Sequence, residues 1–274
     1  MDTGFDNPKP EPTPEPLSGQ ETAKGISEMY EIIGPVNGCQ LVEPTAVLAV
    51  AGLKGYTFLV DAIVNQEEKD NASKLNSQLE QKGLHVGYSD KLNQMTISNL
   101  RGLEYKTKRT KLPGFFPYSS NSGFSGKNRW HWEVDKRIEL VKQQGVLSSD
   151  VETRIYEEAV MFGYPDQAAI DFEECLRTGD INKDLISSDI ELAHPDAKKY
   201  KGPSSDFDYY PSSAKDPEII EYISKAKQII QDFYNSEWFV KISQDPNFIA
   251  AREAQNLRHK MRIDQLLSRR KQKS

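Results

Sequence analysis

The stretch "AVLAVAGLKGYTFLVDAIV", residues 46–64, is the most apolar part of the chain and decides which class of fold is considered. Its length approaches that of a short membrane span, but Lys54, Asp61 and two glycines interrupt it. A membrane helix is expected to hold about 20 consecutive, nearly uncharged residues. We therefore predict no membrane segment and interpret the stretch as a pair of buried helices.

The residues around this stretch extend the helical interpretation. Pro44 suits the first turn of a helix that runs to Ala51, because proline lacks the N–H group that would be unpaired there. The sequence "GLKG" then breaks the pattern, and a second helix is expected from about Tyr56 to Gln81. Residues 25–90 are thus predicted to form an acidic helical segment.

The N-terminal residues have a different composition. Residues 1–24 are rich in proline and glutamate, which favour extended backbone and bury little surface, so we predict a disordered tail. This tail lacks the basic and then apolar order of a secretion signal. The two cysteines, Cys39 and Cys175, form no C-x-x-C pair, which favours a reducing compartment. We expect an intracellular protein, cytoplasmic or nuclear.

Charge is distributed in alternating blocks, although the net charge of the whole chain is −6. Residues 1–90 carry a net charge of −8, residues 91–142 carry +7, residues 143–235 carry −10 and residues 236–274 carry +5. Such asymmetry indicates either an anionic partner for the basic blocks or neutralisation of one block by another inside the fold. The sequence leaves both interpretations open.

The second half of the chain has apolar residues at helical spacing. Residues 146–180 are predicted to form a helical hairpin, residues 181–215 an acidic connector, and residues 216–274 an antiparallel helix pair with a basic end. The apolar positions of that pair are Ile219, Ile223, Ala226, Ile230 and Phe233 in the first helix, and Ala250, Ala254, Leu257 and Met261 in the second.

Residues 112–140 are rich in aromatic residues, glycine and serine. In "KNRWHWEV", Trp130 and Trp132 alternate with Arg129 and His131, which is the period of a strand. "FFPY" is its expected partner, so we predict a small β-hairpin near residues 115–134, inside a basic segment of residues 91–145. The order of a Phe-Pro pair, a glycine-rich tip, Arg-Trp and a short helix resembles the wing of small winged-helix DNA-binding proteins of the excisionase type. The resemblance is confined to this segment and implies a hairpin that contacts DNA.

Basic residues cluster around this hairpin, as phosphate contacts require, and aromatic residues lie among them, as base stacking requires. The alternative is that the aromatic residues belong to the core and the basic residues pair with the acidic blocks. The candidate nucleic-acid-binding residues are Lys106, Lys108, Arg109, Lys111, Lys127, Arg129, Trp130, Lys136 and Arg137.

Other motifs in the sequence are incomplete. A phosphate-binding loop needs glycine and a hydroxyl residue where Asn121 and Asn128 stand. The loop from Asp180 to Glu191 has oxygen ligands at EF-hand spacing, but Leu185 occupies the position that requires glycine. The four histidines show no zinc-binding spacing, and no G-x-S-x-G motif is present. We therefore predict no metal site, no cofactor and no catalytic residue.

The sequence thus predicts a mainly α protein of short helices and helical hairpins with one small β-hairpin. Our leading hypothesis is a non-enzymatic binding protein that contacts DNA or RNA through its central basic segment and basic C-terminus. The alternative is a protein-interaction or assembly subunit that docks neighbouring chains through its C-terminal helix pair, and an unrecognised enzyme is third. One solvent-facing basic surface would favour nucleic acid, whereas pairing of basic residues with acidic segments would favour assembly.

Overall fold

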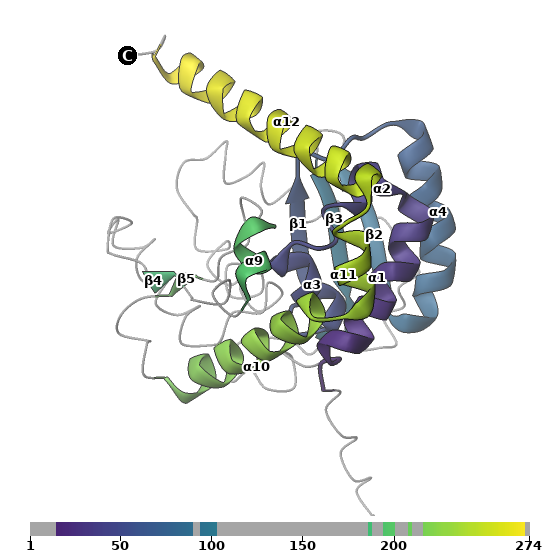
Figure 1. Ribbon diagram of the computed structural model, residues 1–274, viewed down its shortest axis with the longest axis vertical. Helices are drawn as coiled ribbons and strands as arrows, with labels where there is room; N and C mark the ends of the chain where they lie inside the picture. Colours follow the sequence, from purple (N-terminus) through teal and green to yellow (C-terminus); the bar gives the residue numbers. More distant parts are fainter. Residues whose placement is uncertain are drawn as a thin grey trace, which may run out of the picture.

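The structure is a computed structural model, and it describes residues 15–89, 94–102, 186–187, 194–200, 208–209 and 216–271 of the 274-residue chain. These residues are mainly helical and include a small three-stranded antiparallel sheet, so the predicted mainly α class is confirmed (Figure 1). The hairpin expected near residues 115–134 and the helical hairpin expected at residues 146–180 lie outside the described residues.

The fold begins earlier than the sequence suggested. Helix α1 (Gly19–Ile33) starts with a capping box, in which the Ser18 hydroxyl accepts from the Glu21 N–H and the Glu21 carboxylate accepts from the Ser18 N–H. The Leu17 N–H donates to the Ala51 carbonyl at 2.7 Å. Residues 15–24 are therefore part of the folded body, and the tail boundary predicted at residue 24 is corrected accordingly.

Two short helices follow, α2 (Pro35–Gly38) and α3 (Pro44–Ala51). Pro44 occupies the first turn of α3, as predicted, and every residue of α3 is buried. Gly52 ends the helix in the left-handed conformation, with φ of 82°, which glycine adopts without the steric cost of a Cβ atom.

The prediction of a second helix from about Tyr56 to Gln81 is wrong for the first part of that range. Residues Tyr56–Val60 form strand β1, and the helix α4 (Gln66–Leu79) begins ten residues later than expected and is followed by the short 3₁₀ helix η1 (Glu80–Lys82). The run Tyr-Thr-Phe-Leu-Val consists mostly of β-branched and aromatic residues, which favour strands. Helix α4 starts where the Asn65 side chain accepts from the Glu68 N–H. Residues 25–90 are thus mixed in structure.

Strands β2 (Leu84–Ser89) and β3 (Gln94–Asn99) complete the sheet, whose order is β1-β3-β2. Tyr56 pairs with Ser98, and Leu84 pairs with Asn99. Helix α3 packs against β1 and β3, and α4 packs against β2. The Asn99 side-chain amide donates to the carbonyls of Ala49 and Val50, at 2.8 and 3.0 Å, and so joins the central strand to α3.

The predicted acidic connector, residues 181–215, contains ordered elements. Strands β4 (Ile186–Ser187) and β5 (Asp208–Tyr209) pair with each other, and helix α9 (Pro195–Lys199) lies between them in the sequence. Ala197 and Tyr200 are fully buried in the main core. The described part of the connector therefore contributes to the packing of the body.

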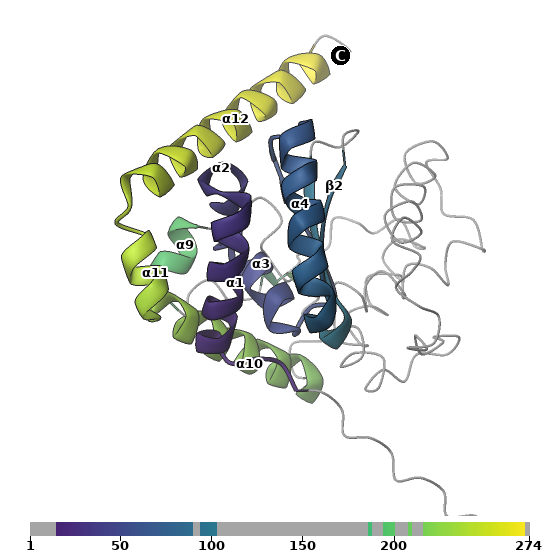
Figure 2. The ribbon, with the colours of Figure 1, turned by 90° about the vertical axis from the view of Figure 1, so that its right-hand side faces the viewer.

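The C-terminal residues form α10 (Pro217–Tyr234), α11 (Glu237–Ile242) and α12 (Pro246–Lys271). The apolar positions predicted for the first of these helices are buried or partly buried, but they pack against α1 and α3. Helix α12 packs against α2, and Figures 1 and 2 show α10 and α12 at opposite ends of the body with α11 between them. The two long helices exist as predicted, but they do not form an antiparallel pair.

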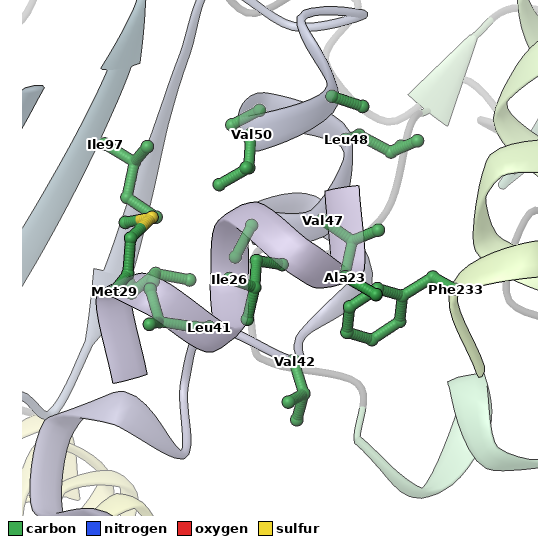
Figure 3. Packing of buried hydrophobic residues seen from close by; sticks show 14 of the residues in the cluster. Ala23, Ile26, Met29, Leu41, Val42, Val47, Leu48, Val50, Ile97 and Phe233 are labelled. Carbon is green, nitrogen blue, oxygen red and sulfur yellow. The ribbon is translucent and has the colours of Figure 1, made fainter. Parts of the chain in front are cut away.

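The hydrophobic core lies where α1, α3, the sheet and α10 meet. Figure 3 shows Ile26 and Ala23 of α1 beside Val47 of α3 and Phe233 of α10, while Met29 points toward Ile97 of β3. All six side chains are at most 2% exposed. This core holds α1, α3 and the sheet as one unit, and Phe248 at the start of α12 also belongs to it.

Candidate functional site

Helix α12 attaches to the body through a polar face. Arg252, Gln255, His259 and Arg262 are spaced by three, four and three residues, so they lie along one side of the helix. All four side chains bond to residues of the N-terminal body or to one another. Phe248, which is 1% exposed, adds an apolar contact at the start of the same face. Hydrogen bonds and ion pairs along this face, together with Phe248 in the core, therefore hold the helix on the body.

The first anchor point is the Glu43 carboxylate, which lies at the start of α3. Arg252 Nη1 donates to Glu43 Oε1 at 2.9 Å, and Gln255 Nε2 donates to the same oxygen at 3.1 Å. Arg252 Nη1 also donates to Gln255 Oε1 at 2.7 Å. Glu43 is 1% exposed and Arg252 is 7% exposed. Burial raises the pKa of the Glu43 carboxyl, and the positive charge of Arg252 opposes this rise.

The second anchor point is Asp61, one residue beyond β1. His259 Nδ1 lies 2.6 Å from Asp61 Oδ2, and Arg262 Nη1 donates to Asp61 Oδ1 at 3.2 Å. Arg258 Nε donates to the Asp61 carbonyl at 3.3 Å. Asp61 has φ of 65°, a left-handed conformation that aspartate tolerates better than most residues. This backbone turn brings both the carboxylate and the carbonyl of one residue against α12.

Replacing Asp61 with asparagine is expected to destabilise the protein by about 1 to 2 kcal/mol, because the buried carboxylate that contacts Arg262 and His259 loses its charge. Asparagine retains the tolerance for the left-handed conformation. The measurement is urea denaturation together with hydrogen exchange of the α12 amides, which should be protected less after residue 258. The matched control is Asp264→Asn, on the exposed side of α12, which should change neither quantity. Unchanged exchange in Asp61→Asn would contradict the assigned anchor.

The opposite face of α12 is apolar and exposed. Ala250, Ala254, Leu257 and Met261, which we call the α12 seam, are spaced by four, three and four residues and are all exposed. Leu257 is 60% exposed and Met261 is 54% exposed. From its spacing alone, the seam is predicted to pack against the other C-terminal helix, and this prediction is wrong. The body instead binds the polar face of α12, because the buried carboxylates of Glu43 and Asp61 need charged or hydrogen-bonding partners.

Other buried titratable groups lie in the body. Lys54 is 5% exposed, and its Nζ donates to Thr45 Oγ1 at 3.3 Å, while Thr45 Oγ1 lies 2.6 Å from Thr57 Oγ1. Burial lowers the pKa of Lys54 to about 8. Burial also raises the pKa of the Cys39 thiol to about 12, so this thiol stays protonated at neutral pH and is a poor nucleophile.

The candidate nucleic-acid-binding residues, from Lys106 to Arg137, all lie outside the described residues. At the basic C-terminus, Arg252 and Arg262 form ion pairs with carboxylates of the N-terminal body, and Arg258 bonds to a carbonyl there. Glu43, Asp61 and their partners are not recognisable as a cluster from spacing in the sequence. The available signal was the charge of Asp61 within an otherwise apolar stretch, since a buried charge requires a partner.

Comparisons with known protein families, with curated proteins and with solved structures give no match to this chain. Within the described ranges, no group of three or more His, Cys, Asp or Glu side chains could hold a metal ion. Among those same residues, no helix is both long enough and apolar enough to span a membrane.

Proposed function

We propose that this protein is a non-enzymatic assembly subunit, which docks another protein through the seam of α12. The observation that carries the proposal is the orientation of this helix. Its polar face is bound to the body and its heptad-spaced apolar face is exposed, the reverse of what solvation alone favours for a surface helix. A helix that presents an apolar stripe at heptad spacing is suited to pack against a second helix.

The anchors support this role because they fix the direction of the exposed seam. The contacts of Arg252 with Glu43 and of Arg262 with Asp61 lie ten residues apart on α12, which prevents rotation of the helix on the body. The C-terminal end of α12 extends past the other described elements (Figures 1 and 2). A partner therefore meets a rigid and accessible surface, which lowers the entropy lost on binding.

Nucleic-acid binding is the second candidate function, and it stays a prediction. The basic residues of the central segment favour it, whereas the ion pairs of Arg252 and Arg262 favour neutralisation within the fold. If four or five residues such as Lys108, Arg109 and Lys127 neutralise phosphates, affinity for duplex DNA should fall with salt at a log-log slope of about −4. Binding with this salt dependence would support the second function.

Assembly is tested with a photoreactive amino acid placed at position 257 of the full chain and activated in the cells that produce it. We expect crosslinks to one or a few proteins of defined size, because the side chain at this position is 60% exposed on the proposed docking surface. The control is the same amino acid at position 220, where Ile220 is 54% exposed on α10 and lies away from the seam.

Comparison of the two positions separates a specific partner from non-specific association. Crosslinks from position 257 that are missing from position 220 support assembly through α12. Equal crosslinking from both positions, or none from position 257, contradicts it. Crosslinks to nucleic acid from position 257 would instead favour the second function.

A further inference from the structure

We propose that the partner of the α12 seam is a second copy of this chain, bound through an antiparallel pair of α12 helices. This inference rests on the proposed function, since it identifies the docked protein. It comes from the order of residues along the exposed face of α12, and from the charged side chains that flank that face.

Residue sizes along the seam favour an antiparallel pair. Its order is small, small, large, large: Ala250, Ala254, Leu257 and Met261. In an antiparallel pair of identical helices, the start of one seam lies against the end of the other. Ala254 of one copy therefore faces Leu257 of the second copy, and Ala250 faces Met261. Each contact occurs twice because the pair is symmetric. Every layer then combines one large and one small side chain, which fills the space between two helices evenly. The contact is also self-complementary, as a two-fold interface requires.

Charges beside the seam favour the same arrangement. Glu253 and Lys260 are exposed and lie on one flank of the seam, seven residues apart. In the antiparallel register, Glu253 of one copy lies opposite Lys260 of the other, so two such pairs form by symmetry. The other flank places Arg258 opposite Ala251 and brings no like charges together. The seam ends at each side in a polar layer of Asp264 and Asn247, which limits the register.

A parallel pair of the same helices fits less well. Like residues would then meet, which gives two layers of alanine against alanine followed by leucine and methionine against themselves. The next layer would place Asp264 against Asp264 of the second copy, and two carboxylates in contact repel each other. On the flanks, Lys260 would lie opposite Gln265 and lose its acidic partner, whereas Glu253 would lie opposite Arg258. The core layers of the seam, more than its flanks, therefore favour the antiparallel direction.

The dimer is expected to be weak and reversible. The seam has four residues in each copy, far fewer than the roughly 20 to 30 residues on each side of a standard interface. We expect a dissociation constant on the order of 100 micromolar. Sedimentation equilibrium of the purified full chain, from about one tenth to ten times that concentration, should show a transition from monomer to dimer.

Variants of the seam and of its flanks identify the interface. Leu257→Lys should abolish the dimer over this range, because it places two lysines in the central layers. Glu253→Lys alone and Lys260→Glu alone should each weaken the dimer about tenfold, since each brings like charges together at both symmetric pairs. The double variant Glu253→Lys/Lys260→Glu should restore the original affinity to within about threefold. All three substituted positions, Glu253, Leu257 and Lys260, are exposed in the monomer, so circular dichroism and urea denaturation should remain unchanged.

Each possible outcome supports or overturns a different part of the proposal. A monomer at every concentration overturns the second copy as partner, and the proposed function then stands or fails on the crosslinks formed from position 257. A dimer that Leu257→Lys does not affect overturns the seam as interface. A dimer that Leu257→Lys abolishes, but that the double charge exchange does not restore, overturns the antiparallel register.

Discussion

Replacing Arg252 with methionine is expected to lower the free energy of unfolding by about 3 to 5 kcal/mol, the largest destabilisation we predict. The reason is that the buried carboxylate of Glu43 would remain without its cationic partner. Glu43 is 1% exposed, and its oxygen Oε1 would keep the Gln255 amide as a hydrogen-bond donor but lose the cation that offsets its burial. Methionine fills most of the volume of the arginine stem, so the loss reports the charge more than a cavity. Urea denaturation at pH 8 measures it.

The pH dependence of this variant provides a second check. Burial already raises the pKa of Glu43, and removal of Arg252 takes away the charge that opposes the rise. A carboxyl whose pKa is higher in the folded state than in the unfolded state loses stability as pH rises through the folded-state value. The deficit of Arg252→Met should therefore be larger at pH 8 than at pH 5.

The double variant Glu43→Leu/Arg252→Met is the matched control. It removes both charges, and apolar replacement of a whole buried pair is often neutral or stabilising. We expect its stability to lie within about 1 kcal/mol of the original protein. If the double variant is as unstable as Arg252→Met, the loss comes from packing or from Gln255, and the assigned role of the ion pair is wrong.

Part of this fold could be predicted from the sequence because local rules determine it. The first turn of α3 at Pro44 and the buried face of α10 follow from proline chemistry and from apolar spacing. Strand β1 was missed because Tyr56–Val60 is a short apolar run, and periodicity alone does not separate a buried strand from a buried helix over five residues. The β-branched and aromatic content of that run was the available signal.

The candidate site could be predicted less well because α12 carries two regular faces. The spacing of Ala250 to Met261 correctly identified an apolar stripe, but spacing does not say what the stripe contacts. The contacts of the helix depend on Glu43 and Asp61, which lie about 200 residues earlier in the sequence. The positions of Lys106 to Arg137 are outside the described residues, so the nucleic-acid hypothesis has gained no support from the fold.

The second large effect is a stabilisation, expected when Lys54 is replaced with methionine. Lys54 is 5% exposed, and no carboxylate of the described residues forms an ion pair with it. Burial lowers its pKa from 10.5 to about 8, which at about 1.4 kcal/mol per pKa unit corresponds to about 3 kcal/mol at neutral pH. Methionine occupies a similar volume without a charge, and Thr45 retains its hydrogen bond with Thr57. Lys54→Met should therefore be about 3 kcal/mol more stable at pH 7.

The sign of the pH dependence distinguishes this explanation from better packing by methionine. Between pH 8 and 10.5 the unfolded chain binds a proton that the folded protein has released, so the original protein gains stability as pH rises in this window. The advantage of Lys54→Met should fall to about half by pH 9.5. Because burial raises the pKa values of Cys39 and Tyr30, these groups oppose the gain at high pH in both proteins and cancel in the difference. The exposed Lys24→Met serves as control, with a change below about 0.5 kcal/mol at either pH. An advantage of Lys54→Met that stays constant from pH 7 to pH 9.5 would show that packing, and not the buried charge, limits the stability of the turn between α3 and β1.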